Sequence, residues 1–274
     1  MILFLIPYPL NPCLTMITSL QNTKIKWVRS LQASSRTRRQ ESAFVLEGVR
    51  LAEEALSGGA EARLVLYSDE LGERGKKVFN SFASRGALIE KVSPSVMRHA
   101  SDTQTPQGIL VVLPIQTLPL PDDLDFVFIP DSIRDPGNLG GMLRSAAAAG
   151  VNAVLLPPGT VDAYAPKVVR SAMGAHLRLP IRQLSWDEIE GSIERLNIYL
   201  PDASAGISYL DVDLCSPLAL IIGGEAGGAS ARAHKLALTR LHIPMMGDME
   251  SLNAAVAAGI LMFEVVRQRA QPGK

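Results

Sequence analysis

The sequence has 274 residues, of which 47% are hydrophobic and 20% are charged. This composition is typical of a globular protein with a buried core and disfavours an intrinsically disordered chain. Its 27 basic and 27 acidic residues give a formal net charge of zero, so any nucleic-acid surface has to be local. Cys13 and Cys215 lie far apart, which favours a reducing compartment over a disulfide framework. The four histidines lack the spacing of metal ligands, so we predict no metal site.

Residues 1–15 form an apolar segment that Pro7, Pro9 and Pro12 interrupt. The segment is too short to span a membrane, and it lacks the basic start of a signal peptide. We therefore expect a disordered leader or a start codon assigned too far upstream. The rest of the sequence contains no apolar run of membrane-spanning length, so we expect a cytoplasmic protein without a membrane partner.

Residues 16–113 alternate short β-rich runs with helical patterns, which predicts a small α/β domain. Strands are predicted at 44–46, 63–67, 87–89 and 108–113, and helices near 24–33, 48–57, 70–85 and 94–99. Residues 114–123 contain three prolines and no periodicity, so they are predicted to be a stiff linker.

Residues 124–274 repeat the alternation on a larger scale and predict a second α/β domain. Its strands are predicted at 126–129, 153–156, 197–200, 218–222 and 241–243. The run 218–222 is apolar at every position, which is typical of a parallel strand that is covered on both faces.

A cluster of basic residues marks the start of the first domain. Between Met16 and Arg50, seven basic residues face two acidic ones, a local excess of five positive charges. The cluster is either a solvated surface or a set of phosphate contacts, which strengthen binding through counterion release. The candidate RNA contacts are Lys24, Lys26, Arg29, Arg36, Arg38 and Arg39.

A glycine-containing turn follows the predicted strand 126–129. Gly137, Gly140 and Gly141 would let the backbone approach a ligand closely, and a helix of small residues begins there. Arg144 is the one charged residue on that helix, and it is either an anion clamp or a surface residue. The glycine spacing differs from Gly-x-Gly-x-x-Gly, which disfavours a nicotinamide-binding Rossmann domain.

A second glycine-rich segment, 222–228, ends the most apolar strand. Ligands bind at the carboxyl ends of strands in open α/β sheets, so this loop is either part of a site or a plain turn. Glu225 lies among the glycines of this loop, and core packing does not explain a carboxylate at that position.

A third segment, 243–253, reads Ile-Pro-Met-Met-Gly-Asp-Met-Glu-Ser-Leu-Asn and runs into an apolar helical pattern. The positive end of a helix and its free N–H groups commonly bind ligands. Ser251 is also a good candidate for a simple helix N-cap.

Together the three segments resemble the SpoU (TrmH-type) family of RNA ribose 2′-O-methyltransferases. Asn138-x-Gly140-x-x-x-Arg144 is similar to the first motif of that family, and Ile222-Gly-x-Glu225-x-x-Gly228 to the second. Ile243-Pro-Met-x-Gly247 with Ser251-Leu-Asn253 resembles the third. Residues 18–29 and 44–48 are similar to the substrate-binding domain that many members carry. The sequence departs from the usual pattern at Gly224, Ala226 and Ala254-Ala255.

This resemblance implies a homodimer with a C-terminal trefoil-knotted (SPOUT-type) parallel-sheet domain at 124–274, preceded by a smaller α/β RNA-binding domain at 16–113. It implies S-adenosylmethionine (AdoMet) as the cofactor. The cofactor-binding residues that it implies are Gly223, Gly224, Ile243, Met245 and Leu252. Those implied in catalysis and RNA placement are Asn138, Arg144, Glu225, Ser251 and Asn253.

The implied reaction is attack of a ribose 2′-hydroxyl on the sulfonium methyl group. A guanidinium rarely loses its proton, so we expect Arg144 to stabilise the developing alkoxide rather than to act as the base. We expect Glu225 to fix Asn138 or Arg144. The separate first domain favours ribosomal RNA over transfer RNA as the substrate. A transfer-RNA enzyme, a non-catalytic RNA-binding member and a methyltransferase for small molecules or proteins remain the alternatives.

Overall fold

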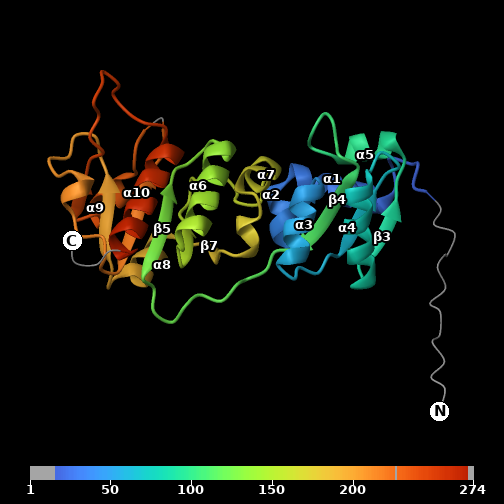
Figure 1. The fold of residues 1–274 in the computed structure, drawn as a ribbon, viewed down its shortest axis with the longest axis horizontal. Coiled ribbons are helices and arrows are strands. Elements are labelled where there is room, and N and C mark those ends of the chain that lie inside the picture. The colour runs from blue at the N-terminus through green and yellow to red at the C-terminus, as the bar shows by residue number, and fades with distance from the viewer. Residues whose placement is uncertain (1–15, 226, 271–274) are drawn as a thin grey trace, which may run out of the picture. The chain divides into compact units, whose positions relative to one another are not determined.

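The computed structural model describes residues 16–225 and 227–270. The chain separates into two compact units, Met1–Pro114 and Ile115–Lys274 (Figure 1). The predicted leader, residues 1–15, lies outside the described residues, and so does Ala226. No helix among the described residues is both long enough and apolar enough to cross a membrane.

The first unit is built on a four-stranded sheet with the order β1-β4-β2-β3. β4 (Ile109–Pro114) pairs antiparallel with β1 (Ala43–Glu47) and β2 (Leu64–Tyr67), and β2 pairs parallel with β3 (Leu88–Lys91). α1 (Thr23–Ala33) and α5 (Pro94–Ala100) bury their apolar residues against one face. The other helices are α2 (Ser35–Glu41), α3 (Val49–Ser57) and α4 (Glu73–Ser84), of which α3 and α4 pack on the opposite face.

The second unit contains a six-stranded parallel sheet with the order β10-β8-β9-β5-β6-β7. Its central pair is β5 (Phe126–Asp131) and β9 (Leu218–Gly223), and β9 is buried along five of its six residues. The parallel, doubly covered strand predicted at 218–222 is therefore confirmed. The other strands are β6 (Ala153–Leu156), β7 (Ile181–Gln183), β8 (Asn197–Pro201) and β10 (Thr239–Leu241).

Helices cover both faces of this sheet because its strand residues are apolar on both sides. Phe126 and Phe128 point into one core and Val127 and Ile129 into the other. The first core is closed by α6 (Pro136–Ala149), α7 (Pro166–Ala172) and α10 (Ala254–Ala270). The second core is closed by α8 (Trp186–Ile193) and α9 (Ala231–Leu236).

Gly140 allows α6 and α7 to pack closely. A Cβ on Gly140 would lie 2.4 Å from the Ser171 Cβ and 2.7 Å from the carbonyl oxygen of Val168. We expected the glycines of this motif to give room to a ligand. At Gly140 that expectation is wrong, because the neighbouring helix occupies the space.

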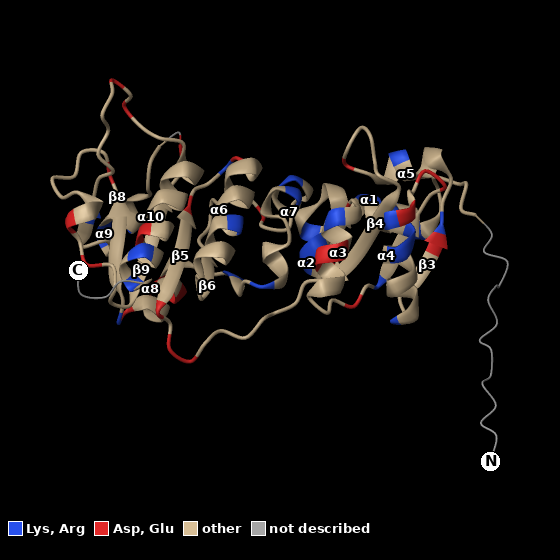
Figure 2. Cartoon of the chain, in the orientation of Figure 1, with Lys and Arg blue, Asp and Glu red and all other residues tan. Residues whose placement is uncertain are grey.

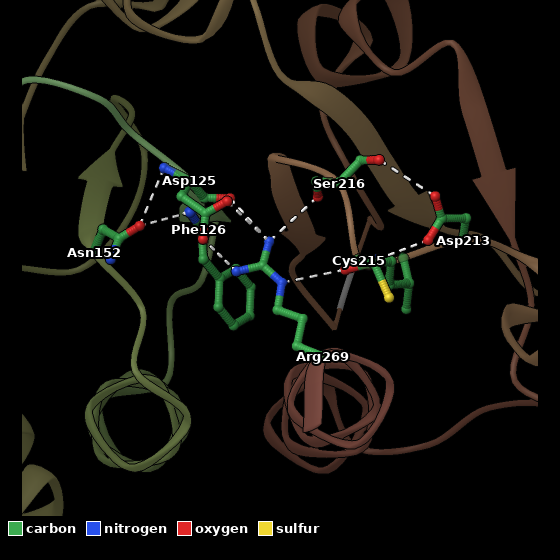
Figure 3. A network of polar contacts seen from close by, with 8 residues as sticks. Asp125, Phe126, Asn152, Asp213, Cys215, Ser216 and Arg269 are labelled. Atoms are coloured by element: carbon green, nitrogen blue, oxygen red, sulfur yellow. Dashed lines mark hydrogen bonds and ion pairs between the residues drawn. The ribbon is translucent and has the colours of Figure 1, made fainter. Parts of the chain in front are cut away.

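The C-terminal end of α10 is tied to the start of β5 (Figure 3). Arg269 Nη1 binds Asp125 Oδ2 at 2.5 Å, and Nη2 donates to the carbonyl oxygen of Ser216 at 3.2 Å. The guanidinium also lies 5.4 Å from the ring centroid of Phe126. Asn152 Oδ1 accepts from the Phe126 amide at 2.7 Å. These contacts fix α10 at the end of the sheet opposite to the glycine-rich loop.

His176 is a buried histidine in a 3-10 turn (Ala175–Leu177), where Nε2 donates to the carbonyl oxygen of Ala163 at 2.6 Å. Burial lowers its pKa to about 4. In the unfolded chain the histidine has an ordinary pKa of ~6.5, so the unfolded state binds the proton at a higher pH than the folded state does. Acid therefore favours unfolding. The stability that neutral His176 contributes is complete above the pKa of the unfolded state and is lost as the pH falls toward 4, the pKa of the folded state.

We expect this linkage to cost about 2 kcal/mol of unfolding free energy between pH 7 and pH 5. Urea unfolding at both pH values measures the loss, and it should shrink by that amount in His176→Gln. His99→Gln is the matched control, because His99 is exposed. An undiminished loss in His176→Gln would contradict the assignment.

The sequence did not predict α2 and β7. α2 reads Ser-Arg-Thr-Arg-Arg-Gln-Glu and has no apolar face, and its one buried residue is Arg38. β7 has three residues, Ile181 to Gln183, at the edge of the sheet. The predicted strand at 241–243 is shifted, since β10 spans Thr239–Leu241.

Candidate active site

A cleft of about 290 Å³ opens where the chain leaves the carboxyl ends of β8 and β9. This volume is close to the lower limit of typical small-molecule sites, roughly 300 Å³. The structure brings all of the predicted cofactor-binding residues to this cleft: Gly223, Gly224, Ile243, Met245 and Leu252. Glu225 and Ser251 line it as well. The second and third of the three segments therefore meet in one cavity.

Gly223 and Gly224 shape the cleft through close backbone contacts. A Cβ on Gly223 would lie 2.3 Å from the Ala229 amide nitrogen, and one on Gly224 would lie 2.4 Å from the Ser132 carbonyl oxygen. Both contacts are with backbone, which cannot swing aside as a side chain can. The loop after β9 therefore folds back on itself and onto the loop after β5, and any side chain at either glycine would push these loops apart.

Three polar side chains form a hydrogen-bonded chain across the motifs. Asn138 Nδ2 donates to Glu225 Oε1, and Asn253 Nδ2 donates to Asn138 Oδ1 at 3.1 Å. The predicted contact between Glu225 and Asn138 is thus present. Asn138 is held at the start of α6, where its backbone N–H donates to Asp135 Oδ1 at 2.9 Å. These two hydrogen bonds link the first, second and third motifs at one place.

Asn253, and not Ser251, caps α10. Asn253 Oδ1 accepts from the backbone N–H groups of Ala255 at 2.9 Å and Val256 at 3.3 Å. The N-cap interpretation of Ser251 is wrong, because the helix begins two residues later than a cap at Ser251 would require. Ser251 is exposed on the lining of the cleft. Its hydroxyl is therefore available to a ligand.

Arg144 lies on α6, six residues beyond Asn138, and its side chain is exposed. It makes no hydrogen bond or ion pair with any residue that the structure describes, and it does not line the cleft. An unpaired guanidinium keeps its full charge and its planar set of donors for an anionic partner. The geometry therefore separates Arg144 from the residues that surround the cofactor cleft.

Asp202 is a cleft residue that the sequence did not single out. It follows the carboxyl end of β8, the position that could have predicted it. Its carboxylate accepts from the Ser204 hydroxyl at 2.6 Å and the Ser204 amide at 2.9 Å. These bonds, with Arg240 at 3.7 Å, hold the pKa of Asp202 below its ordinary value. The cleft thus contains a carboxylate that stays ionised at neutral pH.

The six predicted RNA contacts differ in exposure and in partners, and Figure 2 shows that cationic residues lie along α1 and α2. Arg38 is buried, and its Nη1 donates to the carbonyl oxygens of Leu31 at 2.6 Å and Gln32 at 3.0 Å. Its prediction as an RNA contact is wrong, since it joins α2 to the end of α1. Lys24 pairs with Glu90.

The exposed group is Lys26, Arg29, Arg36 and Arg39. The side chains of these four residues have no ion pair within the described part of the chain. They are the predicted RNA contacts that remain open to a ligand.

Comparison with known proteins decides the family. Residues 125–263 match the model of the SpoU rRNA Methylase family, and residues 22–111 match that of the MRM3-like substrate binding domain. The chain belongs to the SpoU rRNA methylase family. This membership confirms the predicted α/β fold class and implies the trefoil knot. It also confirms the predicted enzyme class, an RNA ribose 2′-O-methyltransferase.

Relatives of this SpoU-family chain are similar over nearly its whole length. A 23S rRNA (guanosine(2553)-2′-O)-methyltransferase from Bacillus subtilis is 33% identical, over 91% of this chain and 98% of the relative. The human mitochondrial rRNA methyltransferase 3 is 32% identical, over 89% and 72%. The AdoMet-bound rRNA methyltransferase of Sinorhizobium meliloti superposes with a TM-score of 0.81 at 27% identity, covering 92% of this chain and 97% of that structure.

Proposed function

We propose that this enzyme uses AdoMet to methylate a ribose 2′-hydroxyl of ribosomal RNA. The observation that carries the proposal is the hydrogen-bonded chain Glu225–Asn138–Asn253 beside the glycine-walled cleft. The names of the relatives support ribosomal RNA as the substrate class, since several curated relatives act on rRNA.

The residues that line the cleft support AdoMet as its ligand. Gly223 and Gly224 bring backbone to its wall, and Ile243, Met245 and Leu252 supply apolar surface for a flat base. Asp202 offers an ionised carboxylate to the cationic part of the ligand. AdoMet, when bound, supplies an electrophilic methyl group on its sulfonium. The neighbouring structure with bound AdoMet supports this assignment.

The residues of the site have different roles in the proposed reaction. Glu225 orients the amide of Asn138, and Asn253 holds the opposite edge of that amide while capping α10. Such a network keeps polar groups in fixed positions, so little reorganisation is needed when the ribose arrives. Arg144 stabilises the negative charge that develops on the ribose oxygen as its proton passes to solvent water. Ser251 orients the nucleotide from the lining of the cleft.

The exposed cations Lys26, Arg29, Arg36 and Arg39 bind RNA phosphates in this proposal. Each phosphate contact adds roughly 0.7–0.9 to the slope of log K against log salt. RNA affinity should therefore strengthen as the salt concentration falls. A salt-independent affinity would favour the alternative of a small-molecule or protein substrate.

Tritium transfer from labelled AdoMet to total RNA tests the activity. Mapping of ribose methylation in rRNA and tRNA from a deletion strain then identifies the substrate. Loss of one rRNA methylation is the expected result. A lost tRNA methylation would assign the enzyme to transfer RNA, and no transfer to any RNA would support the non-catalytic alternative.

We also propose that the enzyme is a homodimer that buries an exposed face of α10. Val256 and Phe263 are seven residues apart, so they share one helix face, and each is 50% exposed. A half-exposed phenylalanine on an apolar helix favours a protein partner. We expect sedimentation equilibrium to give twice the 29.4 kDa chain mass and Phe263→Glu to give the monomer. Leu238→Glu serves as the control, because Leu238 is 94% exposed and lies outside α10.

A further inference from the structure

A second cavity of about 280 Å³ lies beside the cofactor cleft. The two cavities share the wall formed by Gly224, Glu225, Gly228 and Ala229. The remaining lining residues are Ser132, Arg134, Gly227 and Ser230. Arg134 is thus the one cation among the described lining residues, and it lies on the other side of the Glu225 loop from the cofactor cleft.

The acidic residues next to Arg134 are engaged elsewhere. Asp131 is fully buried and accepts from the Ser230 amide at 2.5 Å and the Ser132 hydroxyl at 3.1 Å. Asp135 caps α6 and pairs with Lys167 at 3.5 Å. Arg134 is exposed, and within residues 16–225 and 227–270 it has no hydrogen bond or ion pair. Its guanidinium is therefore free for a ligand although carboxylates stand close to it in the sequence.

The backbone around Arg134 is held in place from several sides. The Val161 amide donates to the Ile133 carbonyl oxygen at 2.8 Å, and the Thr160 hydroxyl donates to the Pro130 carbonyl oxygen at 2.7 Å. Ser132 adopts a φ of 58°, which is rare for a residue other than glycine and costs conformational energy. A loop fixed in this way presents its arginine from a constant position beside the Glu225 loop.

We propose that this second cavity binds a backbone phosphate adjoining the target ribose, and that Arg134 is its ligand. The inference rests on the proposed function. A ribose whose 2′-hydroxyl lies at the Glu225–Asn138 pair has a phosphate on each side, and the cavity shares Glu225 with the cleft. The planar guanidinium matches a phosphate with two parallel hydrogen bonds, and Ser132 and Ser230 are polar residues in the lining.

The test compares Arg134→Ala and Arg134→Lys with the wild type. Arg195→Ala is the matched control, because Arg195 is an exposed arginine of the same unit that follows α8, away from both cavities. Filter binding of labelled rRNA from a deletion strain is measured over a series of salt concentrations, alongside KM for that rRNA. Calorimetry gives the AdoMet affinity of each variant.

We expect Arg134→Ala to weaken rRNA binding and raise KM about tenfold, to lower the salt slope by roughly one, and to leave AdoMet affinity unchanged. Arg134→Lys should restore the slope but only part of the affinity, because lysine keeps the charge and loses the planar fork. An unchanged slope and KM in Arg134→Ala would overturn the subsite, as would an equal loss in Arg195→Ala. The binding measurements test the phosphate subsite even if the wild type transfers no methyl group. Absence of methyl transfer would contradict the proposed function and not the subsite.

Discussion

Replacing Arg144 with alanine should abolish methyl transfer while AdoMet still binds. Arg144 is exposed on α6, does not line the cofactor cleft, and has no ion-pair partner among the described residues. Removing one donor that stabilises a developing oxyanion costs roughly 10²–10³-fold in rate, and here the donor also carries a full charge. Tritium transfer to rRNA measures the rate, and calorimetry measures AdoMet affinity, which should stay within about twofold.

Arg195→Ala is again the control for losing an exposed arginine, and it should keep full activity. If Arg144→Ala also failed to bind AdoMet, the division between a binding cleft and a separate catalytic cation would be wrong. Retained methyl transfer in Arg144→Ala would instead remove Arg144 from the reaction.

Replacing Gly223 with alanine should give the opposite pattern, in which AdoMet binding is lost first. The new Cβ would lie 2.3 Å from the Ala229 amide nitrogen and 2.5 Å from the carbonyl carbon of Gly228. Backbone has to move to relieve such contacts, and overpacking of this kind costs about 1–3 kcal/mol. Because the displaced loop forms the cleft wall, AdoMet affinity should fall roughly 10–100-fold.

Gly227→Ala is the matched control, since it lies in the same loop and its Cβ would meet no atom within 4 Å. Calorimetry with AdoMet should separate the two variants, and circular dichroism should show that both retain the fold. An equal loss of affinity in the two variants would mean that loop flexibility, rather than the close contact at Gly223, controls the cleft.

The two expected results reflect how the site is organised. The cleft depends on backbone that glycine alone permits, so its residues are sensitive to added volume. We expect Arg144 to act through its charge, so truncation of its side chain should remove its effect. Asn138 lies on α6, the helix that also carries Arg144, and its side chain is hydrogen-bonded at 3.1 Å to Asn253, which follows the cleft residue Leu252.

Several details of the fold were beyond sequence reasoning for identifiable reasons. α2 carries three arginines and no apolar stripe, so no hydrophobic periodicity marks it. In the sequence Arg38 cannot be distinguished from its basic neighbours. In the structure its guanidinium donates hydrogen bonds to two carbonyl oxygens at the end of α1. Ser251 and Asn253 are both good N-cap residues, and the side-chain bonds to Ala255 and Val256 decide for Asn253.

The sequence by itself determined most of the element types of the two α/β units, the family and, through the family resemblance, the predicted cofactor-binding residues that meet in the cleft. These follow from local patterns: apolar runs, glycine positions and the order of three motifs. Tertiary structure alone decided that Gly140 serves helix packing, that Arg38 is buried, and that Arg134 faces a second cavity beside Glu225. Burial and partnership depend on residues distant in the chain, such as Ser171 beside Gly140 and Ser230 beside Asp131, and no local pattern records them.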